Sequence, residues 1–192
     1  MARPARANHR ELLVLEVAKQ LLAKKEIHVA NACREIGIAP SLANHYFQDK
    51  DELAREAWLS IMLAFVTEDF EQLDHFGQQD DWEGVRAFIF EVFSPRRLPV
   101  RQAHIRGLGV AMLDSELGGQ VEQIQRETTE RWHALLKTYA DKGILKPKVD
   151  LWSLALLFTA IPIGVTAVQG ELTQAERASI TDTWLTMLRA VL

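Results

Sequence analysis

Apolar side chains recur at helical spacing along almost the whole chain, and this periodicity constrains the fold more than any other feature of the sequence. No stretch of five or more residues alternates between apolar and polar as a half-buried strand does. The pattern predicts about nine helices, at approximately residues 8–23, 29–36, 40–46, 50–76, 82–93, 100–113, 119–142, 149–169 and 174–191. We therefore expect an all-α protein, with three short helices first and longer ones after.

Several of the expected boundaries carry residues that suit helix ends. Side chains that can cap an N-terminus stand before three helices: Asn8, Asp49, and Asp80 or Asp81. Gly37 suits a left-handed C-terminal cap, and Pro40 suits a first helical turn. Gly107 and Gly109 interrupt the segment of residues 100–113, so we expect it to be only weakly helical. The next helix is expected to begin after Gly118-Gly119 or slightly before.

Composition places the chain among ordinary soluble globular proteins, with 48% hydrophobic and 25% charged residues. A single cysteine, Cys33, excludes an intramolecular disulfide, and the basic segment Met1 to Arg10 lacks the apolar stretch of a signal peptide. Residues 1–55 carry a net charge of +2 and the remaining residues −6, a division typical of a nucleic-acid-binding head on a regulatory body. We expect a cytoplasmic protein with two domains, residues 1–50 and 51–192.

The segment from Leu151 to Gly170 contains no charged residue and is long enough to span a bilayer. Pro162 and Gly164 lie at its centre, and no basic cluster follows it to fix an orientation. A helix buried inside a protein or at a dimer interface is equally uncharged. We favour the buried helix and expect no membrane association.

The segment from Val29 to Leu53 predicts a helix-turn-helix. Gly37 lies in a tight turn between two short helices, and Ile36 and Ile38 flank it as apolar plugs. The second helix of such a unit can lie in the DNA major groove. Small and polar side chains on it suit base edges, with Asn44 able to pair with adenine through two hydrogen bonds: Ser41, Asn44 and His45. Tyr46 and Lys50 are residue types that reach phosphate oxygens, as does the helix N-terminus at Asp49-Lys50.

These residues resemble the signature of the TetR family of transcription regulators, G-[VI]-x6-H-Y-F-x2-K-x2-L. The matching residues are Gly37-Ile38, His45-Tyr46-Phe47, Lys50 and Leu53, and the resemblance covers about residues 9–59. It implies a homodimer of all-α subunits. A three-helix head and the start of the fourth helix would bind DNA, the fourth to seventh helices would enclose a small-molecule pocket, and the last two would form the dimer interface.

The resemblance also assigns roles to positions of the head. Ser41, Asn44 and His45 would read or approach bases, and the residues expected to touch backbone phosphates are Pro40, Leu42, Tyr46 and Lys50. The basic arm Arg3–Arg10 would add phosphate or minor-groove contacts. Two positions depart from the family pattern, because His28 and Ala39 stand where it usually has Thr and Ser and so remove two side-chain caps.

The body offers residues for a mostly apolar effector pocket, although aromatic and Met side chains at helical spacing are often plain core. The candidates are Trp58, Met62, Phe65, Phe88, Phe93, His104, Met112 and Trp132, with His104, Arg106, His133 and Gln125 as polar groups. The candidates for the dimer interface are Trp152, Ile180, Trp184 and Leu188.

No arrangement of residues indicates catalysis, a metal or a cofactor. The six histidines and Cys33 show no CxxC, HxxxH or HExxH spacing, and Gly107-x-Gly109 fails the dinucleotide-binding pattern. We therefore expect no enzyme but a homodimeric transcription regulator, with repression as the expected direction, that binds a palindromic double-stranded DNA operator and is released by a small molecule. The alternative is an all-α small-molecule-binding protein or enzyme without DNA affinity.

Overall fold

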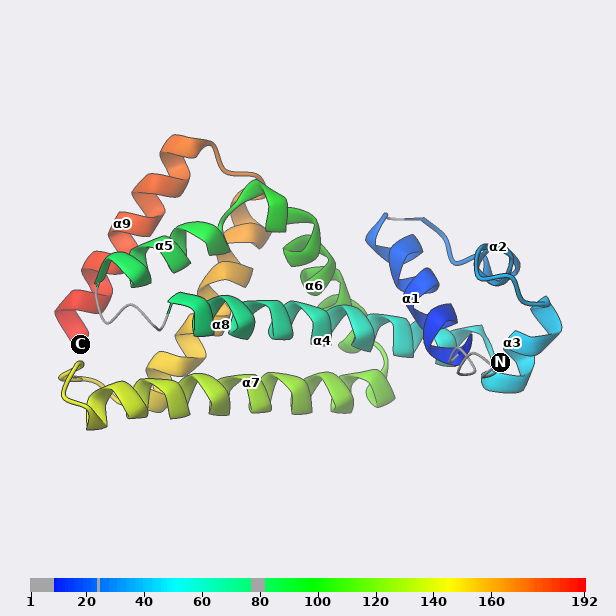
Figure 1. Ribbon diagram of the computed structural model, residues 1–192, viewed down its shortest axis with the longest axis horizontal. Coiled ribbons are helices and arrows are strands. Elements are labelled where there is room, and N and C mark those ends of the chain that lie inside the picture. Colours follow the sequence, from blue (N-terminus) through cyan, green and yellow to red (C-terminus); the bar gives the residue numbers. More distant parts are fainter. Residues whose placement is uncertain (1–8, 24, 77–81) are drawn as a thin grey trace, which may run out of the picture. The chain divides into compact units, whose positions relative to one another are not determined.

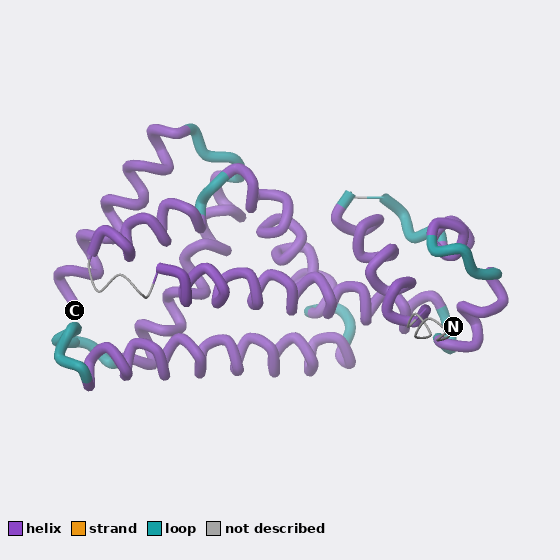
Figure 2. Tube along the Cα trace, in the orientation of Figure 1, coloured by secondary structure: helices purple, strands orange, loops and turns teal. Residues whose placement is uncertain are grey.

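The computed structural model describes residues 9–23, 25–76 and 82–192, without the side chains of residues 69 and 72–76. In these ranges the helices are, in chain order (Figure 1), α1 His9–Leu22, α2 Val29–Glu35, α3 Pro40–Tyr46, α4 Lys50–Phe76, α5 Trp82–Val92, α6 Leu98–Ala111, α7 Ser115–Asp141, α8 Leu151–Gln169 and α9 Gln174–Val191. One 3-10 turn, η1 Pro95–Arg97, precedes α6. The described part contains helices and loops and no strand (Figure 2), which confirms the predicted all-α fold. The expected caps Asn8, Asp80 and Asp81 lie outside the described residues.

The chain forms two compact units, Met1–Leu63 and Ala64–Leu192, which we call the head and the body. The boundary lies inside α4 and not at residue 50, where the sequence predicts it. The first turns of α4 belong to the head because Glu56 of α4 pairs with Arg10 of α1, and because Leu53 and Ala57 are buried.

The head is a three-helix cluster in which α1, α2 and α3 pack against one another. Leu13 and Val17 of α1 are fully buried, as are Ala32 and Cys33 of α2. Neither His28 nor Ala39 caps its helix with a side chain, as their residue types predict. The side chain of Gln20 in α1 instead accepts a hydrogen bond of 2.8 Å from the backbone N–H of His28. This contact fixes the start of α2 without the missing cap.

The body consists of packed helix pairs around one aromatic core. α7 packs against α6 and α8, and α5 packs against α9. Trp132 of α7 stacks on Phe158 of α8 with ring centroids 4.9 Å apart, and Phe158 contacts Trp184 of α9 at 5.5 Å. These rings link three helices through direct contacts, and burial of large aromatic side chains is a main source of stability in such a core.

α6 is a continuous helix through Gly107 and Gly109, which corrects the expectation of a weak and interrupted segment. It starts at Leu98, with Pro99 in its first turn, where a missing N–H costs nothing. A glycine inside a helix costs only about 1 kcal/mol. Packing of the α6 face that includes Arg101, Ala103 and His104 outweighs that cost. Gly118 and Gly119 likewise lie inside α7, which begins earlier because Asp114 accepts hydrogen bonds from two backbone N–H groups.

Candidate functional site

The turn between α2 and α3 is held by backbone hydrogen bonds around Gly37. This residue has φ of +72°, the left-handed conformation that glycine adopts without strain. Its N–H donates to the carbonyl of Arg34 at 3.2 Å, and the N–H of Ile38 donates to the carbonyl of Cys33 at 2.9 Å. The two bonds form a Schellman motif, as the predicted C-terminal cap requires. They fix the direction in which α3 leaves α2.

α3 has one anchored side and one free side. Ala43 and the following Phe47 are buried, so these two residues anchor α3. Four of the predicted DNA-contacting residues on α3 are exposed: Pro40, Ser41, Asn44 and His45. Leu42 and Tyr46 are half-buried, and the Tyr46 ring lies 5.7 Å from that of His45. The side chains expected to read bases therefore lie together on the accessible side of the second helix of the motif.

The start of α4 is organised by two carboxylates. Asp49 accepts a hydrogen bond of 2.7 Å from the backbone N–H of Glu52, and Glu52 accepts one of 2.6 Å from the N–H of Gln48. Lys50 is exposed at this helix N-terminus. The predicted phosphate contact therefore sits on a fixed helix end, where free N–H groups attract anions.

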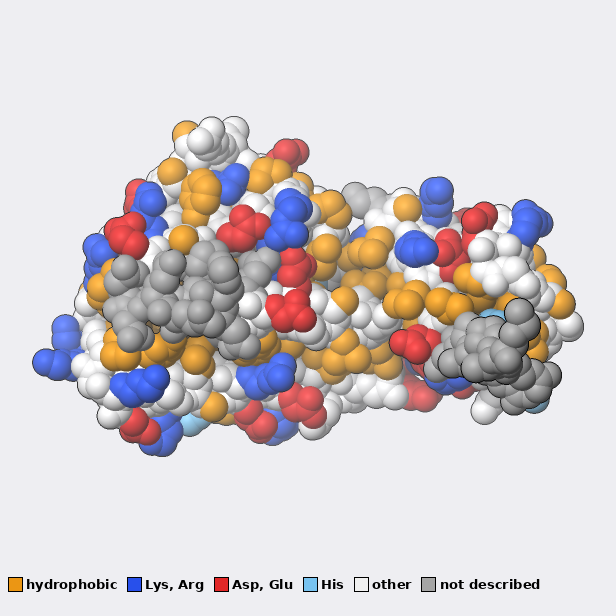
Figure 3. Space-filling model, viewed as in Figure 1, with side chains coloured by type: hydrophobic (Ala, Val, Ile, Leu, Met, Phe, Trp, Pro, Cys, Tyr) orange, Lys and Arg blue, Asp and Glu red, His pale blue; other side chains and the backbone are white. Residues whose placement is uncertain are grey.

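The surface of the head is not uniformly basic. Residues 25–52 contain three Lys or Arg and five Asp or Glu, and Figure 3 shows both signs of charge interspersed over this unit. Arg10 was expected in a basic arm but lies in α1, where it pairs with Glu56 and covers the Phe47 ring at 5.0 Å. Arg3 and Arg6 lie outside the described residues. Of the cations expected to contact phosphate, Lys50 is the one that lies exposed at a helix N-terminus.

The candidate pocket residues fall into separate groups. Trp58 and Met62 are buried on the part of α4 that belongs to the head, whereas Phe65 lies in the body and contacts His104 at 4.5 Å. The aromatic core of the body contains Phe88, Phe93 and Trp132. The expectation that Met112 lines the pocket is wrong. Met112 is the C-cap residue of α6, and 87% of its surface is exposed, so it does not line the interior.

The body contains a buried polar cluster. The sequence predicted His104 and Gln125 as candidates, but it did not predict the two arginines beside them, Arg97 and Arg101. Arg97 and Arg101 are 1% and 3% exposed. Arg101 donates from Nε to Thr166 Oγ1 of α8 at 2.9 Å and from its terminal nitrogen to the carbonyls of Val92 and Ser94. Arg97 lies 3.8 Å from Glu68 of α4. The spacing of residues 97, 101 and 104 places them on one helical face, but residue 97 fell in the gap between the expected helices 82–93 and 100–113.

His104 contacts Gln125 of α7 through Nε2 at 3.1 Å. Burial lowers its pKa from 6.5 to about 4, so the imidazole is neutral at pH 7. The polar candidate Arg106 is half-buried and donates to the carbonyl of Gln102 within α6, and His133 is half-buried beside Trp152. Of the polar candidates, His104 and Gln125 are therefore the two that meet in the body.

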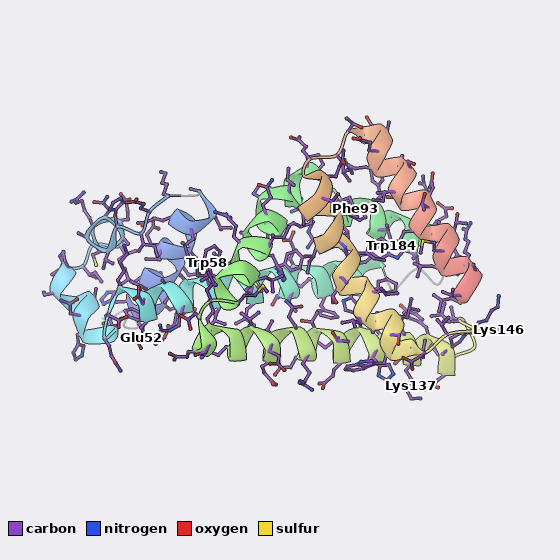
Figure 4. All side chains as sticks on the ribbon, turned by 180° about the vertical axis from the view of Figure 1, so that it is seen from behind. Glu52, Trp58, Phe93, Lys137, Lys146 and Trp184 are labelled. Carbon is purple, nitrogen blue, oxygen red and sulfur yellow. The ribbon has the colours of Figure 1, made fainter. Side chains whose placement is uncertain are left out.

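The candidates for the dimer interface are only partly accessible. The expectation that Trp184 and Leu188 lie at the dimer interface is wrong. They are 5% and 2% exposed within a single chain and leave almost no surface to a second copy. Figure 4 shows Trp184 beside Phe93, and the two rings are 6.0 Å apart. Ile180 is half-buried, and Trp152 keeps 42% of its surface exposed.

The accessible apolar face of α8 and α9 carries other residues. Leu156, Leu157 and Val168 of α8 are 52%, 50% and 88% exposed, and Met187 of α9 is 57% exposed. An open groove of about 610 Å³ lies beside them, and its lining includes Gly164, Val165, Val168, Leu172 and Ile180. By length and composition, α8 is also a helix that could cross a membrane. We call this surface the α8–α9 face.

The described residues contain no group of three or more His, Cys, Asp or Glu side chains that could hold a metal ion. Cys33 is fully buried in α2, and burial raises the pKa of its thiol, so it is poorly suited to act as a nucleophile.

No protein-family model and no curated protein matches this sequence. Similar solved structures include a Rhodococcus protein described as a TetR-family transcriptional regulator, with a TM-score of 0.72, 13% identity, and coverage of 93% of this chain and 97% of that one. GusR of Salmonella enterica has a TM-score of 0.72, 18% identity, and coverage of 100% and 99%. A protein described as a transcriptional regulator of Pseudomonas aeruginosa PAO1 has a TM-score of 0.62, 19% identity, and coverage of 98% and 93%. The chain therefore has the fold of TetR-family transcriptional regulators.

Proposed function

We propose that the protein is a DNA-binding transcription regulator that reads its operator through α3. The observation that carries this proposal is that Ser41, Asn44 and His45 of α3 are exposed, while Ala43 and Phe47 are buried and anchor the helix. Asn44 suits the two hydrogen bonds that adenine offers in the major groove. Tyr46 and Lys50 would contact the flanking phosphates and set the register of the helix.

The functional unit in this proposal is a homodimer formed through the α8–α9 face. Leu156, Leu157 and Val168 of α8 and Met187 of α9 are exposed apolar side chains that a second copy would cover. Two heads in one dimer read two half-sites about one helical turn, roughly 34–36 Å, apart, which calls for a palindromic operator. Because a second copy covers α8, the proposal also makes the protein cytoplasmic and soluble without detergent.

A small molecule bound in the body would control DNA binding through α4. This helix belongs to both units: Lys50 starts it in the head, and Phe65 lies on it in the body. A ligand that favours one position of α4 changes the equilibrium between DNA-competent and incompetent dimers, with a coupling of typically about 1–3 kcal/mol. We propose repression as the output and release from the operator as the effect of the ligand.

The double variant Tyr46→Phe with Lys50→Ala tests the DNA-binding surface in the full-length protein. Both changes leave the buried residues of the head in place, so we expect the dimer to persist while operator affinity falls at least tenfold. The matched control is Lys137→Ala, which removes an exposed lysine paired with Asp141 on α7. Unchanged operator affinity in the double variant would contradict the assigned surface.

A second candidate function is small-molecule binding without DNA affinity. Two observations favour it: residues 25–52 contain more acidic than basic residues, and a polar cluster is buried in the body. This candidate predicts ligand binding with equal, weak affinity for all duplexes. Sequence-specific DNA binding by the purified protein would exclude it.

A further inference from the structure

The first helix of the helix-turn-helix, α2, begins without the local signals that normally start a helix. It has seven residues, no side-chain cap from His28 and no acidic residue in its first turn. Its third residue is Asn31, whereas a capping box needs Glu or Gln at that position. Helices this short are marginal in water on their own, and contacts with other segments supply most of their stability. The first turn of α2 therefore depends on the rest of the head.

Gln20 of α1 binds both backbone groups of the residue that precedes α2. Its Oε1 accepts a hydrogen bond of 2.8 Å from the N–H of His28, and its Nε2 donates a longer one of 3.4 Å to the carbonyl of His28. The same carbonyl accepts the first two backbone bonds of α2, from the N–H groups of Asn31 and Ala32, each at 3.0 Å. One side chain thus holds the residue on which α2 is built. We call this pair of hydrogen bonds the Gln20 contact.

The packing of α2 leaves its start to this contact. The buried residues of α2 are Ala32 and Cys33, which both follow the first turn. Their side chains are small, and the free energy gained by burial grows with the apolar area that is buried. In the first turn Val29 is only half-buried, and Ala30 is exposed. Packing therefore holds mainly the second half of α2, and the Gln20 contact holds its beginning.

The position of α2 determines the position of α3. The turn between them is built on the end of α2, because the N–H groups of Gly37 and Ile38 donate to the carbonyls of Arg34 and Cys33. Ala39 gives α3 no side-chain cap of its own. A shift of α2 is therefore carried to the exposed residues of α3. Hydrogen bonds hold only over a narrow range of distances and angles, so base contacts from α3 require α2 to be fixed.

We propose that Gln20 is a positioning residue for DNA recognition. Its side-chain amide takes the place of the missing cap of α2 and holds α2, and through the turn also α3, in the orientation that reads the operator. It acts on α3 through α2 and not through a contact with a base. The inference rests on the proposed function, because it concerns the same DNA-binding surface.

The first experiment titrates the full-length parent protein and Gln20→Met with the duplex that the parent enriches from a random pool. Met is about as good a helix former as Gln but makes neither hydrogen bond. Binding must then also order the first turn of α2, so affinity should fall about 3- to 30-fold, the range expected for the loss of one helix cap.

The control Gln123→Met makes the same change on α7, where the amide of Gln123 donates to Glu127 of the same helix. This variant should bind the duplex like the parent protein. A loss of less than threefold in Gln20→Met, or an equal loss in the two variants, would overturn the proposal.

Variants of His28 separate positioning from general destabilisation. In the Gln20→Met protein, His28→Ser supplies a side-chain cap to α2 and should recover most of the lost affinity, whereas His28→Ala removes the imidazole without adding a cap and should recover none. In the parent protein, where the Gln20 contact is present, His28→Ser should change affinity less than twofold. Recovery by His28→Ser no greater than that by His28→Ala would overturn the proposal.

Amide hydrogen exchange measures the Gln20 contact without DNA. The amides of Asn31 and Ala32 should exchange about 3- to 30-fold faster in Gln20→Met than in the parent protein, and those of α7 at the same rate. Specific DNA binding by the parent with unchanged exchange and affinity in Gln20→Met contradicts only the inference. Faster exchange in a protein whose parent shows no specific DNA binding contradicts the proposed function and leaves the role of Gln20 at the start of α2 in place.

Discussion

Asn44 and Lys50 occupy neighbouring parts of the head but should contribute to DNA binding in different ways. Asn44 lies on the exposed side of α3, where it would form hydrogen bonds with a base, and Lys50 lies at the N-terminus of α4, where it would neutralise a phosphate. Asn44→Ala should lower affinity for the selected site by about 10- to 100-fold and leave the salt dependence unchanged. Lys50→Ala should reduce the slope of log K against log salt by about 1.

These two effects are measured by binding titrations at several salt concentrations on the selected site and on a scrambled duplex. Asn44→Ala should reduce the difference between the two duplexes, and Lys50→Ala should weaken binding to both. If Asn44→Ala weakened both duplexes equally, Asn44 would not read a base.

His104 should make the body sensitive to mild acid. Its pKa is about 4 in the folded protein and 6.5 in an ordinary environment. Between these values the unfolded chain binds a proton that the folded chain does not. Stability is therefore full above about pH 6.5 and falls as the pH decreases towards 4. From pH 7 to pH 5 the loss amounts to about 2 kcal/mol.

Urea unfolding of the parent protein and of His104→Phe at pH 7 and pH 5 measures this contribution. The variant has no imidazole at this position and should lose less free energy of unfolding over the same range. An equal loss in the two proteins would assign the acid sensitivity to other groups.

At the scale of helices, substitution of Gly37 and of Gly109 by alanine should change the stability of the protein in opposite directions. Both have free space where a Cβ atom would lie, but Gly37 has φ of +72° at the end of α2, whereas Gly109 lies inside α6. Gly37→Ala should cost about 1–2 kcal/mol, because an L-residue is strained in the left-handed conformation. Gly109→Ala should gain about 0.5–1 kcal/mol, because alanine loses less entropy in a helix.

Thermal and urea unfolding of the two variants, each beside the parent protein, test this pair. A gain in stability from Gly37→Ala would contradict the left-handed turn, and a loss from Gly109→Ala would contradict the continuous α6.

Most helix boundaries were predictable because local signals fix them. Pro40, Gly37 and the periodic apolar positions placed α1 to α3 within about two residues of their observed ends. α6 was predicted at residues 100–113, but its continuity was not predictable, because Gly107 and Gly109 weaken a helix locally while the packing that outweighs them comes from other helices. The expected gap between residues 93 and 100 is present, since η1 separates α5 from α6, but the sequence did not predict that Arg97 and Arg101 are buried.

At the scale of the whole molecule, the sequence did not show which apolar side chains of α8 and α9 are buried in the core and which are exposed. α8 is apolar around its whole circumference, so periodicity does not distinguish its buried side from its exposed side. The sequence assigned Trp184 and Leu188 to the dimer interface, and the fold places them in the core. The head was easier to predict, because its turn and its α3 residues form a specific local motif.

Leu156→Glu tests the α8–α9 face as a dimer interface. Leu156 is 52% exposed in one chain, so the charge should not disturb the folded subunit, but pairing of two copies would bury it without a partner charge. We expect the parent protein to be a dimer without detergent and Leu156→Glu to be a monomer by light scattering. The control Leu113→Glu changes a leucine that is 92% exposed at the turn between α6 and α7 and should leave the dimer intact. Dissociation by both variants, or by neither, would contradict the assigned interface.

The most direct test of the account is the binding of the purified full-length protein to double-stranded DNA. Duplexes are selected from a random pool, and the enriched sequence is titrated beside a scrambled duplex at two salt concentrations. A dimeric DNA-binding regulator should enrich a palindrome with half-sites about one helical turn apart, bind it at least about a hundredfold more tightly than the scrambled duplex, and lose affinity steeply as salt rises. No enriched sequence, with equal and weak binding to all duplexes, would contradict a role in DNA recognition.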